Sequence, residues 1–290
     1  MHPGSVLRQR LQQEKVLVIP GGGSPMEMKL IEQAGFDGAY LSGYATAATR
    51  FGLPDIGLMA FGEVESAVAA CRRVTELPIV VDCDTGYGDI INVQHTVRAM
   101  ARQGVAAIQI EDQAWPKRCG HLNDKLVEPI DVAVRKVRAA VAAAKGTETL
   151  IVARTDARGP LGLDEALNRC RLFHEAGADI LFVDGPESME DLERIGGELP
   201  GVLMANMSET GKTPLMPASQ LQALGFKLVI FPSATVRLAV KIMGDFLGEL
   251  RETGDSRPWI SRMASLDETN LAMDMDKFRA FEADILAAGK

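Results

Sequence analysis

Eight short apolar runs recur along the chain, and most of them are apolar throughout instead of alternating with polar residues. They are Val16–Pro20, Ala39–Leu41, Ile79–Val81, Ala107–Ile110, Leu150–Ala153, Ile180–Val183, Val202–Ala205 and Leu228–Phe231. Their mean spacing of about thirty residues matches the length of one βα unit. Continuous apolar runs are typical of parallel strands that helices cover on both faces.

A glycine stands where a helix is expected to end before every second run. These glycines are Gly35, Gly104, Gly177 and Gly225. Glycine suits this position because it adopts the left-handed conformation without a steric penalty. Helical stretches such as Val132–Lys145 and Leu163–Glu175 lie between the runs. The pattern therefore predicts an α/β protein with one (β/α)8 TIM barrel over residues 1–250, and a doubly wound sheet is the alternative.

A helical tail follows the last run. The segment Val236–Arg251 reads as a helix, Gly254–Pro258 as a turn, and a Met-rich, charged helical stretch continues to Lys290. Residues 251–290 exceed what a barrel needs, so we expect a C-terminal helical extension. Two interpretations stay open: the tail packs against a neighbouring subunit, or it is a solvated capping helix.

Composition narrows the functional class. The 290 residues carry 31 Lys and Arg against 39 Asp and Glu, a net charge of −8. Nucleic-acid and membrane-surface proteins usually present a basic face, so both functions are disfavoured. No signal-peptide pattern or long apolar run is present, and four cysteines do not make a disulfide scaffold, so we expect a cytoplasmic protein. Three of the cysteines are expected to be inert core residues: Cys71, Cys83 and Cys170.

Four carboxylates follow strands at the end of the barrel where active sites lie. Asp82 and Asp84 end the third run, Glu111 ends the fourth, and Asp55 follows the second strand's loop. Four crowded acids repel one another unless a cation intervenes, and oxygen ligands without histidine favour Mg²⁺ or Mn²⁺ held partly through waters. The alternative is that one or two of these acids cap the following helix.

The loop after the fourth strand combines a thiol with cationic side chains. Cys119 lies within two residues of Lys117, Arg118 and His121. Cationic neighbours favour the thiolate and make a cysteine chemically useful. The chain has no CxxC or Cys/His spacing typical of zinc sites.

Polar residues also end three later strands. Arg154 suits a bound carboxylate, and Asn206 and Ser208 can donate hydrogen bonds to developing negative charge. Asp184 follows the sixth strand. Each could instead be a satisfied structural group, and the case rests on their shared location.

Two motifs resemble the isocitrate lyase/phosphoenolpyruvate mutase superfamily. Residues 81–88, Val-Asp-Cys-Asp-Thr-Gly-Tyr-Gly, are similar to its metal motif, and residues 117–121, Lys-Arg-Cys-Gly-His, to its lyase signature on a gating loop. The resemblance covers about residues 5–250 and points to the short-chain branch of 2-methylisocitrate and 2,3-dimethylmalate lyases. It implies a Mg²⁺-dependent, retro-aldol type cleavage of a 2-hydroxy di- or tricarboxylate to pyruvate and a second acid, commonly by a homotetramer that exchanges its last barrel helix.

The resemblance also implies roles for individual residues. Asp82 would bind the metal directly, and the other three acids would help through waters. Cys119 would protonate the second product, with Tyr40 as the base aided by Arg154. The remaining candidates are Lys117 and His121 as further catalytic residues, and Ser42, Gly43, Tyr44, Gly120, Asp184, Asn206, Ser208 and Arg237 as substrate-binding residues.

Four positions bear on the choice of substrate. Tyr44 stands where lyases of the family usually have glycine, Asp184 where they have glutamate, and Leu122 where methylisocitrate lyases have arginine. Fewer cations favour a dicarboxylate, whereas Arg237 matches a carboxylate-binding arginine and keeps a tricarboxylate open. An oxaloacetate hydrolase or decarboxylase, a carboxyphosphonoenolpyruvate mutase and a non-catalytic metabolite-binding barrel are the alternative functions.

Overall fold

The computed structural model describes residues 1–120 and 125–288. Within them the chain forms two compact units, Met1–Val236 and Arg237–Lys290. The sequence places the end of the barrel domain near residue 250, and that domain boundary stays a prediction. The two units are described separately.

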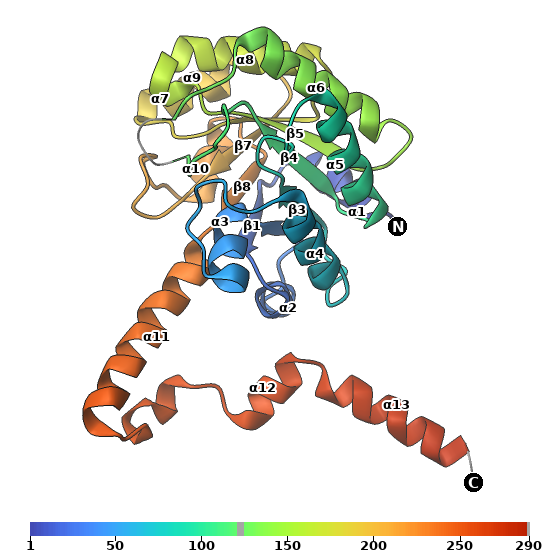
Figure 1. Ribbon diagram of the computed structural model, residues 1–290, viewed down its shortest axis with the longest axis vertical. Coiled ribbons are helices and arrows are strands. Elements are labelled where there is room, and N and C mark those ends of the chain that lie inside the picture. The colour runs from blue at the N-terminus through green and yellow to red at the C-terminus, as the bar shows by residue number, and fades with distance from the viewer. Residues whose placement is uncertain (121–124, 289–290) are drawn as a thin grey trace. The chain divides into compact units, whose positions relative to one another are not determined.

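The first unit is a closed barrel of eight parallel strands, in which β8 pairs with β1. Figure 1 shows the strands at the centre with helices around them. The strands are β1 (Leu17–Gly22), β2 (Ala39–Leu41), β3 (Ile79–Asp82), β4 (Ala107–Glu111), β5 (Leu150–Thr155), β6 (Ile180–Val183), β7 (Val202–Asn206) and β8 (Leu228–Phe231). Each apolar run of the sequence coincides with a strand, except that Val16 precedes β1. The predicted (β/α)8 barrel is therefore confirmed, and the doubly wound sheet is excluded.

Helices alternate with the strands. They are α1 (Pro3–Leu11), α2 (Pro25–Gln33), α3 (Gly43–Thr46), the π-helical turn η1 (Ala47–Phe51), α4 (Phe61–Arg72), α5 (Ile90–Arg102), α6 (Ile130–Ala144), α7 (Arg158–Leu161), α8 (Leu163–Glu175), α9 (Met189–Glu198) and α10 (Ala218–Ala223). Both helices predicted between strands are present, as α6 and α8. Gly177 and Gly225 end helices with φ of 97° and 99°, as their positions predicted.

The barrel interior is apolar except at the carboxyl ends of the strands. One cluster of buried side chains inside the barrel includes Ile19, Phe182 and Met204, and it also contains Leu7 and Leu11 of α1. Helix α1 therefore covers the amino ends of the strands with apolar side chains. Most of the buried polar groups described below stand toward or just beyond the opposite ends, whereas Arg169 and Asp191 stand on helices.

The second unit is helical and buries little by itself. It continues α11 (Ala234–Thr253) and contains the 3₁₀ turn η2 (Arg257–Arg262), α12 (Leu266–Ala272) and α13 (Met275–Ala288). Trp259 is its one buried residue among those described; the indole stacks edge-on against Phe246 and donates a hydrogen bond to Glu249 Oε2 at 2.8 Å. No helix in the described ranges is both long and apolar enough to span a bilayer.

Candidate active site

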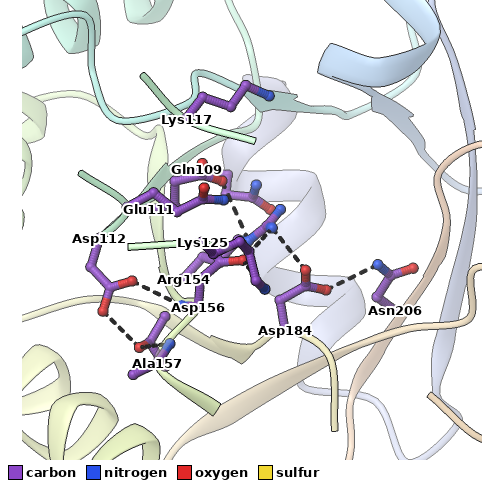
Figure 2. Close-up of polar contacts among 12 residues, drawn as sticks. Gln109, Glu111, Asp112, Lys117, Lys125, Arg154, Asp156, Ala157, Asp184 and Asn206 are labelled. Atoms are coloured by element: carbon purple, nitrogen blue, oxygen red, sulfur yellow. Dashed lines mark hydrogen bonds and ion pairs between the residues drawn. The ribbon is translucent and has the colours of Figure 1, made fainter. Parts of the chain in front are cut away.

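Strand register brings the predicted polar residues together. Asp82 on β3 pairs with Gln109 on β4, and Glu111 at the end of β4 pairs with Arg154 on β5. Neighbouring strand positions in a parallel sheet lie about 5 Å apart, so these side chains share one end of the barrel. Figure 2 shows Gln109, Glu111, Arg154, Asp184 and Asn206 converging there.

The four acids do not serve as helix caps. The helices that follow them begin at Phe61, Ile90 and Ile130, and their N-caps are Ala60, Asp89 and Pro129. The helix-capping interpretation of Asp55, Asp82, Asp84 and Glu111 is therefore wrong, because none of the four stands at a helix start.

Asp82 ties three strands together. Its Oδ1 accepts hydrogen bonds from Gln109 Nε2 at 3.1 Å and from the backbone N–H of Asp84 at 3.2 Å, and its Oδ2 accepts one from the backbone N–H of Gly43 at 3.3 Å. Tyr40 donates its hydroxyl to Gln109 Oε1 at 2.9 Å. Burial, together with the charge of Asp82, raises the pKa of Tyr40 well above its usual range, so the phenol holds its proton at neutral pH.

Asp84 and Glu111 are buried carboxylates whose oxygens make no hydrogen bond with the described part of the chain. Asp84 has an ion pair with Lys117, and within residues 1–120 and 125–288 Glu111 has one such contact, of 3.4 Å with Arg154 Nε. Burial raises the pKa of Asp84 to about 7, against the opposing charge of Lys117. Burial also raises the pKa of Glu111 well above its usual range. Such unsatisfied buried oxygens are costly without a further partner.

Lys117 carries a positive charge into this acidic cluster. Its Nζ lies 2.5 Å from Asp55 Oδ1 and 2.7 Å from Asp84 Oδ1. Burial disfavours the charged ammonium, but Asp84 and Asp55 hold the pKa of Lys117 well above its usual range. Ion pairs of Lys117 thus link its loop to two of the four acids.

The next residues of that loop reach Arg154. The backbone N–H of Cys119 donates to the carbonyl of Asp55 at 3.2 Å, and Cys119 is partly exposed, whereas the other cysteines are buried as predicted. A Cβ at Gly120 would lie 1.7 Å from Asp184 Oδ2 and 2.4 Å from Arg154 Nη2. The close approach therefore requires glycine at position 120.

Arg154 is surrounded by carboxylates. It donates to Asp184 Oδ2 from Nη2 at 2.7 Å and to Asp156 from Nε and Nη2 at 2.8 and 2.9 Å. Asn206 donates to the other oxygen of Asp184 at 3.1 Å. Arg154, Asp184 and Asn206 therefore form one buried polar group, as their strand-end positions predicted.

The remaining predicted residues lie around this centre or outside the described barrel. Ser42 is buried and accepts the N–H of Ala45 as the N-cap of α3, and Ser208 lies 3.5 Å from Ser233 Oγ. Tyr44 is exposed. Arg237 belongs to the second unit.

Two residues discussed in the sequence, His121 and Leu122, lie outside the described residues. Nothing in the described geometry therefore bears on their predicted roles.

Sequence reasoning missed the residues that link the predicted ones. Gln109 joins Tyr40 to Asp82, and Asp156 and Lys125 pair behind Arg154 at 2.8 Å. Gln109 was detectable as a polar residue in the middle of an apolar strand.

Comparison with known proteins identifies the family. A sequence profile described as phosphoenolpyruvate phosphomutase matches residues 7–251. The chain is 38% identical to 2,3-dimethylmalate lyase of Eubacterium barkeri over 97% of its own length and 98% of that protein. It is 42% identical to 2-methylisocitrate lyase of Aeropyrum pernix, covering 92% of the chain and 85% of that protein.

Solved structures agree with the sequence matches. Oxaloacetate acetylhydrolase in complex with 3,3-difluorooxalacetate superposes with a TM-score of 0.93 at 31% identity, covering 100% of this chain and 98% of that one. Phosphonopyruvate hydrolase in complex with oxalate and Mg²⁺ gives 0.88 at 26% identity, covering 99% and 100%.

The chain belongs to the phosphoenolpyruvate phosphomutase family, within the isocitrate lyase/phosphoenolpyruvate mutase superfamily. It is an enzyme of the carbon–carbon lyase class.

Proposed function

We propose that the enzyme cleaves a 2-hydroxy di- or tricarboxylate, similar to 2,3-dimethylmalate or 2-methylisocitrate, into pyruvate and a second carboxylic acid. The observation that carries this proposal is that an acidic cluster and a buried arginine lie together at one end of the barrel. Asp84 and Glu111 offer buried oxygens without hydrogen bonds, while Arg154 and the Cys119–Gly120 backbone stand beside them. An anion-binding arginine, a cation-binding acid cluster and a thiol are what such a cleavage needs.

The acid cluster fits a divalent cation. Buried carboxylate oxygens that make no hydrogen bond with the described residues favour a hard cation such as Mg²⁺, with Mn²⁺ as the alternative. No three acidic, imidazole or thiol groups in the described ranges are arranged to ligate one ion directly. We therefore propose that Asp82 is the direct ligand and that Asp84, Glu111 and Asp55 act through waters. When bound, the ion would polarise the oxygens of a chelating 2-oxo or 2-hydroxy acid.

The first half of the proposed reaction removes the proton of the C2 hydroxyl. Tyr40 is the proposed base, and it can act only after its phenol ionises, because burial raises its pKa; the positive charge of Arg154 opposes that effect, and a bound cation would oppose it further. The backbone of Ser42 and Gly43 would hold the pyruvate half, because Gly43 directs its N–H into the site beside Asp82. The C2–C3 bond then breaks, and its electron pair passes to the second fragment as an enolate.

The second half gives that enolate a proton. Cys119 is the proposed acid: its S–H proton goes to C3, and a thiolate remains that is close in the sequence to the cationic Lys117 and to His121. Asn206 and Ser208 would donate hydrogen bonds to the carboxylate of this fragment. The Gly120 backbone stands against Asp184, where it would keep water from the enolate.

The residues at which this chain departs from the usual family pattern slightly favour a dicarboxylate substrate over a tricarboxylate. Asp184 is one methylene shorter than glutamate, and its carboxylate is already engaged by Arg154 and Asn206. Tyr44 adds a phenol in the segment after Gly43. Arg237 could bind a third carboxylate, so a 2-methylisocitrate-like substrate stays in the proposal.

A coupled assay tests the proposed reaction. Purified enzyme with Mg²⁺ is offered a panel of 2-hydroxy acids that includes 2,3-dimethylmalate and 2-methylisocitrate, and released pyruvate is measured with lactate dehydrogenase and NADH. We expect pyruvate from at least one of them and none after treatment with EDTA. Absence of pyruvate from the whole panel would refute the proposal.

Oxaloacetate provides the test of a second candidate function. The similarity to oxaloacetate acetylhydrolase, with a TM-score of 0.93, is the observation that favours it. Oxalate and acetate as products would indicate a hydrolase, and pyruvate and CO₂ a decarboxylase. Either result, without pyruvate from the hydroxy acids, would replace the lyase proposal.

We also propose that the chain assembles as a homotetramer through its second unit. Thirteen large apolar side chains of that unit are exposed: Leu238, Val240, Ile242, Met243, Leu247, Ile260, Met263, Leu266, Leu271, Phe278, Phe281, Ile285 and Leu286. Exposed apolar surface on this scale marks a protein interface. A second copy of the chain is the occupant that the family resemblance implies.

Sedimentation velocity measures the assembly. We expect a particle of four 31.2 kDa chains. Phe281→Asp should dissociate it, because Phe281 is 69% exposed in the single chain, whereas Ile91→Asp on α5, 71% exposed, should leave it intact. A monomeric wild-type protein would contradict the proposal.

A further inference from the structure

A buried chain of ion pairs stands behind Arg154, and the proposed reaction does not use it. The carboxylate of Asp156 accepts hydrogen bonds from Nε and Nη2 of Arg154, at 2.8 and 2.9 Å, so the two side chains form a bidentate pair. The same carboxylate accepts a hydrogen bond from Lys125 Nζ at 2.8 Å. Bidentate pairing fixes the plane of a guanidinium group as well as its position. Figure 2 shows the three side chains together.

Asp156 is itself held in place from the outer side of the barrel. Its backbone N–H donates to Asp112 Oδ1 at 2.8 Å. Asp112 Oδ2 accepts hydrogen bonds from Thr155 Oγ1 at 2.6 Å and from Arg169 Nη1 at 3.0 Å. All of these groups are buried. Asp156 therefore reaches Arg154 from a backbone position that its own neighbours fix.

The pairing decides which edge of the guanidinium remains available. Asp156 takes the Nε hydrogen and one Nη2 hydrogen, and Asp184 takes the other Nη2 hydrogen at 2.7 Å. Among the described residues no group accepts a hydrogen bond from Nη1. The two Nη1 hydrogens are therefore not engaged by the described residues.

Charge balance explains the presence of Lys125. Glu111, Asp156 and Asp184 lie around Arg154, so one guanidinium faces three acids. Burial disfavours the ionised form of Asp156, yet Arg154 and Lys125 hold its pKa below its usual range. Asp156 thus stays an anion and cannot serve as a proton donor near neutral pH.

We propose that Asp156 and Lys125 are positioning residues of the lyase: Asp156 orients Arg154 so that Nη1 faces the substrate's anionic oxygen, and Lys125 compensates the charge of Asp156. The proposal rests on the proposed function in that Arg154 contacts the substrate. A purely structural role would require only that the buried charges balance, whereas positioning requires the carboxylate of Asp156 itself.

Four variants separate these roles. Asp156→Asn keeps the shape and removes the charge, Lys125→Met removes the second cation, and the double variant removes both charges together. Lys125→Arg is the conservative replacement. Asp191→Asn is the matched control, because Asp191 is also buried and pairs with Arg158 Nε at 2.6 Å, outside the group around Arg154.

Kinetics is the first measurement. Asp156→Asn and the double variant are expected to lose about 10- to 100-fold in kcat, as loss of an orienting partner does elsewhere, with KM changed far less. Lys125→Arg and Asp191→Asn should keep wild-type kcat. Recovery of wild-type kcat in a well-folded double variant would overturn the proposal, since charge balance would then suffice.

Proton NMR of ¹⁵N-labelled arginine is the second measurement, and it does not need turnover. The Nε–H of Arg154 is expected to exchange slowly in the wild type and fast in Asp156→Asn and the double variant. Equal exchange in wild type and variants would overturn the positioning role. A wild type that releases no pyruvate from any hydroxy acid would instead refute the proposed function, so the two failures are distinguishable.

Discussion

Cys119→Ser is expected to lower turnover by about 10²- to 10⁴-fold, the usual contribution of a positioned acid or base. A serine hydroxyl holds its proton far more tightly than a thiol, so it cannot protonate an enolate at a useful rate. The backbone of Cys119 is tied to Asp55, and the adjoining Gly120 rests against Arg154 and Asp184. The substitution changes one atom in that loop, so the fold and the binding of Mg²⁺ and pyruvate should persist.

Binding and turnover must be measured on the same preparation. Calorimetric titration with pyruvate in the presence of Mg²⁺ should give wild-type affinity for Cys119→Ser, while the coupled assay gives little product. Cys71→Ala is the control, because Cys71 is buried in the core on α4. Wild-type turnover by Cys119→Ser would remove this thiol from the mechanism.

Glu111→Gln is expected to weaken Mg²⁺ binding and lower kcat/KM by about 10- to 100-fold. In the wild type, Mg²⁺ at a hundred times its Kd should stabilise the fold by about 2.7 kcal/mol, and in a variant that binds 10- to 100-fold more weakly the same Mg²⁺ concentration should give only about 1.4 to 0.4 kcal/mol. The reason is that both oxygens of Glu111 are buried without hydrogen bonds in the described structure. Thermal melting with and without Mg²⁺ measures the difference.

The same variant should change the pH dependence of the metal-free protein. Because burial raises the pKa of Glu111 in the fold above its unfolded value, the folded state binds more protons. Its stability is then greatest below the unfolded pKa of about 4.3 and falls as the pH rises toward the folded value. Asp84, with a pKa of about 7, adds to this trend.

Denaturant titration after EDTA treatment measures that slope between pH 5 and 8. Glu111→Gln should flatten it, because the amide does not titrate. Glu128→Gln is the control, since Glu128 contacts only Lys136, at 3.8 Å, among the described charged groups. An unchanged slope together with unchanged Mg²⁺ affinity in Glu111→Gln would contradict the assignment of Glu111 to the cation site.

Much of the fold was predictable because parallel strands that are buried on both faces need apolar side chains at almost every position. The run Leu150–Ala153 needed no partner to be recognised as a strand. The candidate site followed from the same logic, since polar residues such as Asp82 and Arg154 interrupt the apolar pattern where strands end.

Pairing between side chains was not predictable, because it depends on register and on loops. The register that sets Gln109 beside Asp82 depends on how two strands pair, so the sequence of either strand alone does not reveal it. Lys125 and Asp156 are 31 residues apart and meet only because the loop after β4 returns to the end of β5. The sequence motifs therefore located the reacting groups but not the residues that orient them.

The contact between Gly120 and Asp184 has a consequence for how sequence changes in this enzyme combine. A side chain at position 120 and a longer acid at position 184 would compete for the same space, because a Cβ at Gly120 would already lie 1.7 Å from Asp184 Oδ2. Substitutions at these two positions are therefore expected to be epistatic rather than additive. An attempt to alter substrate range through position 184 therefore has to keep glycine at position 120.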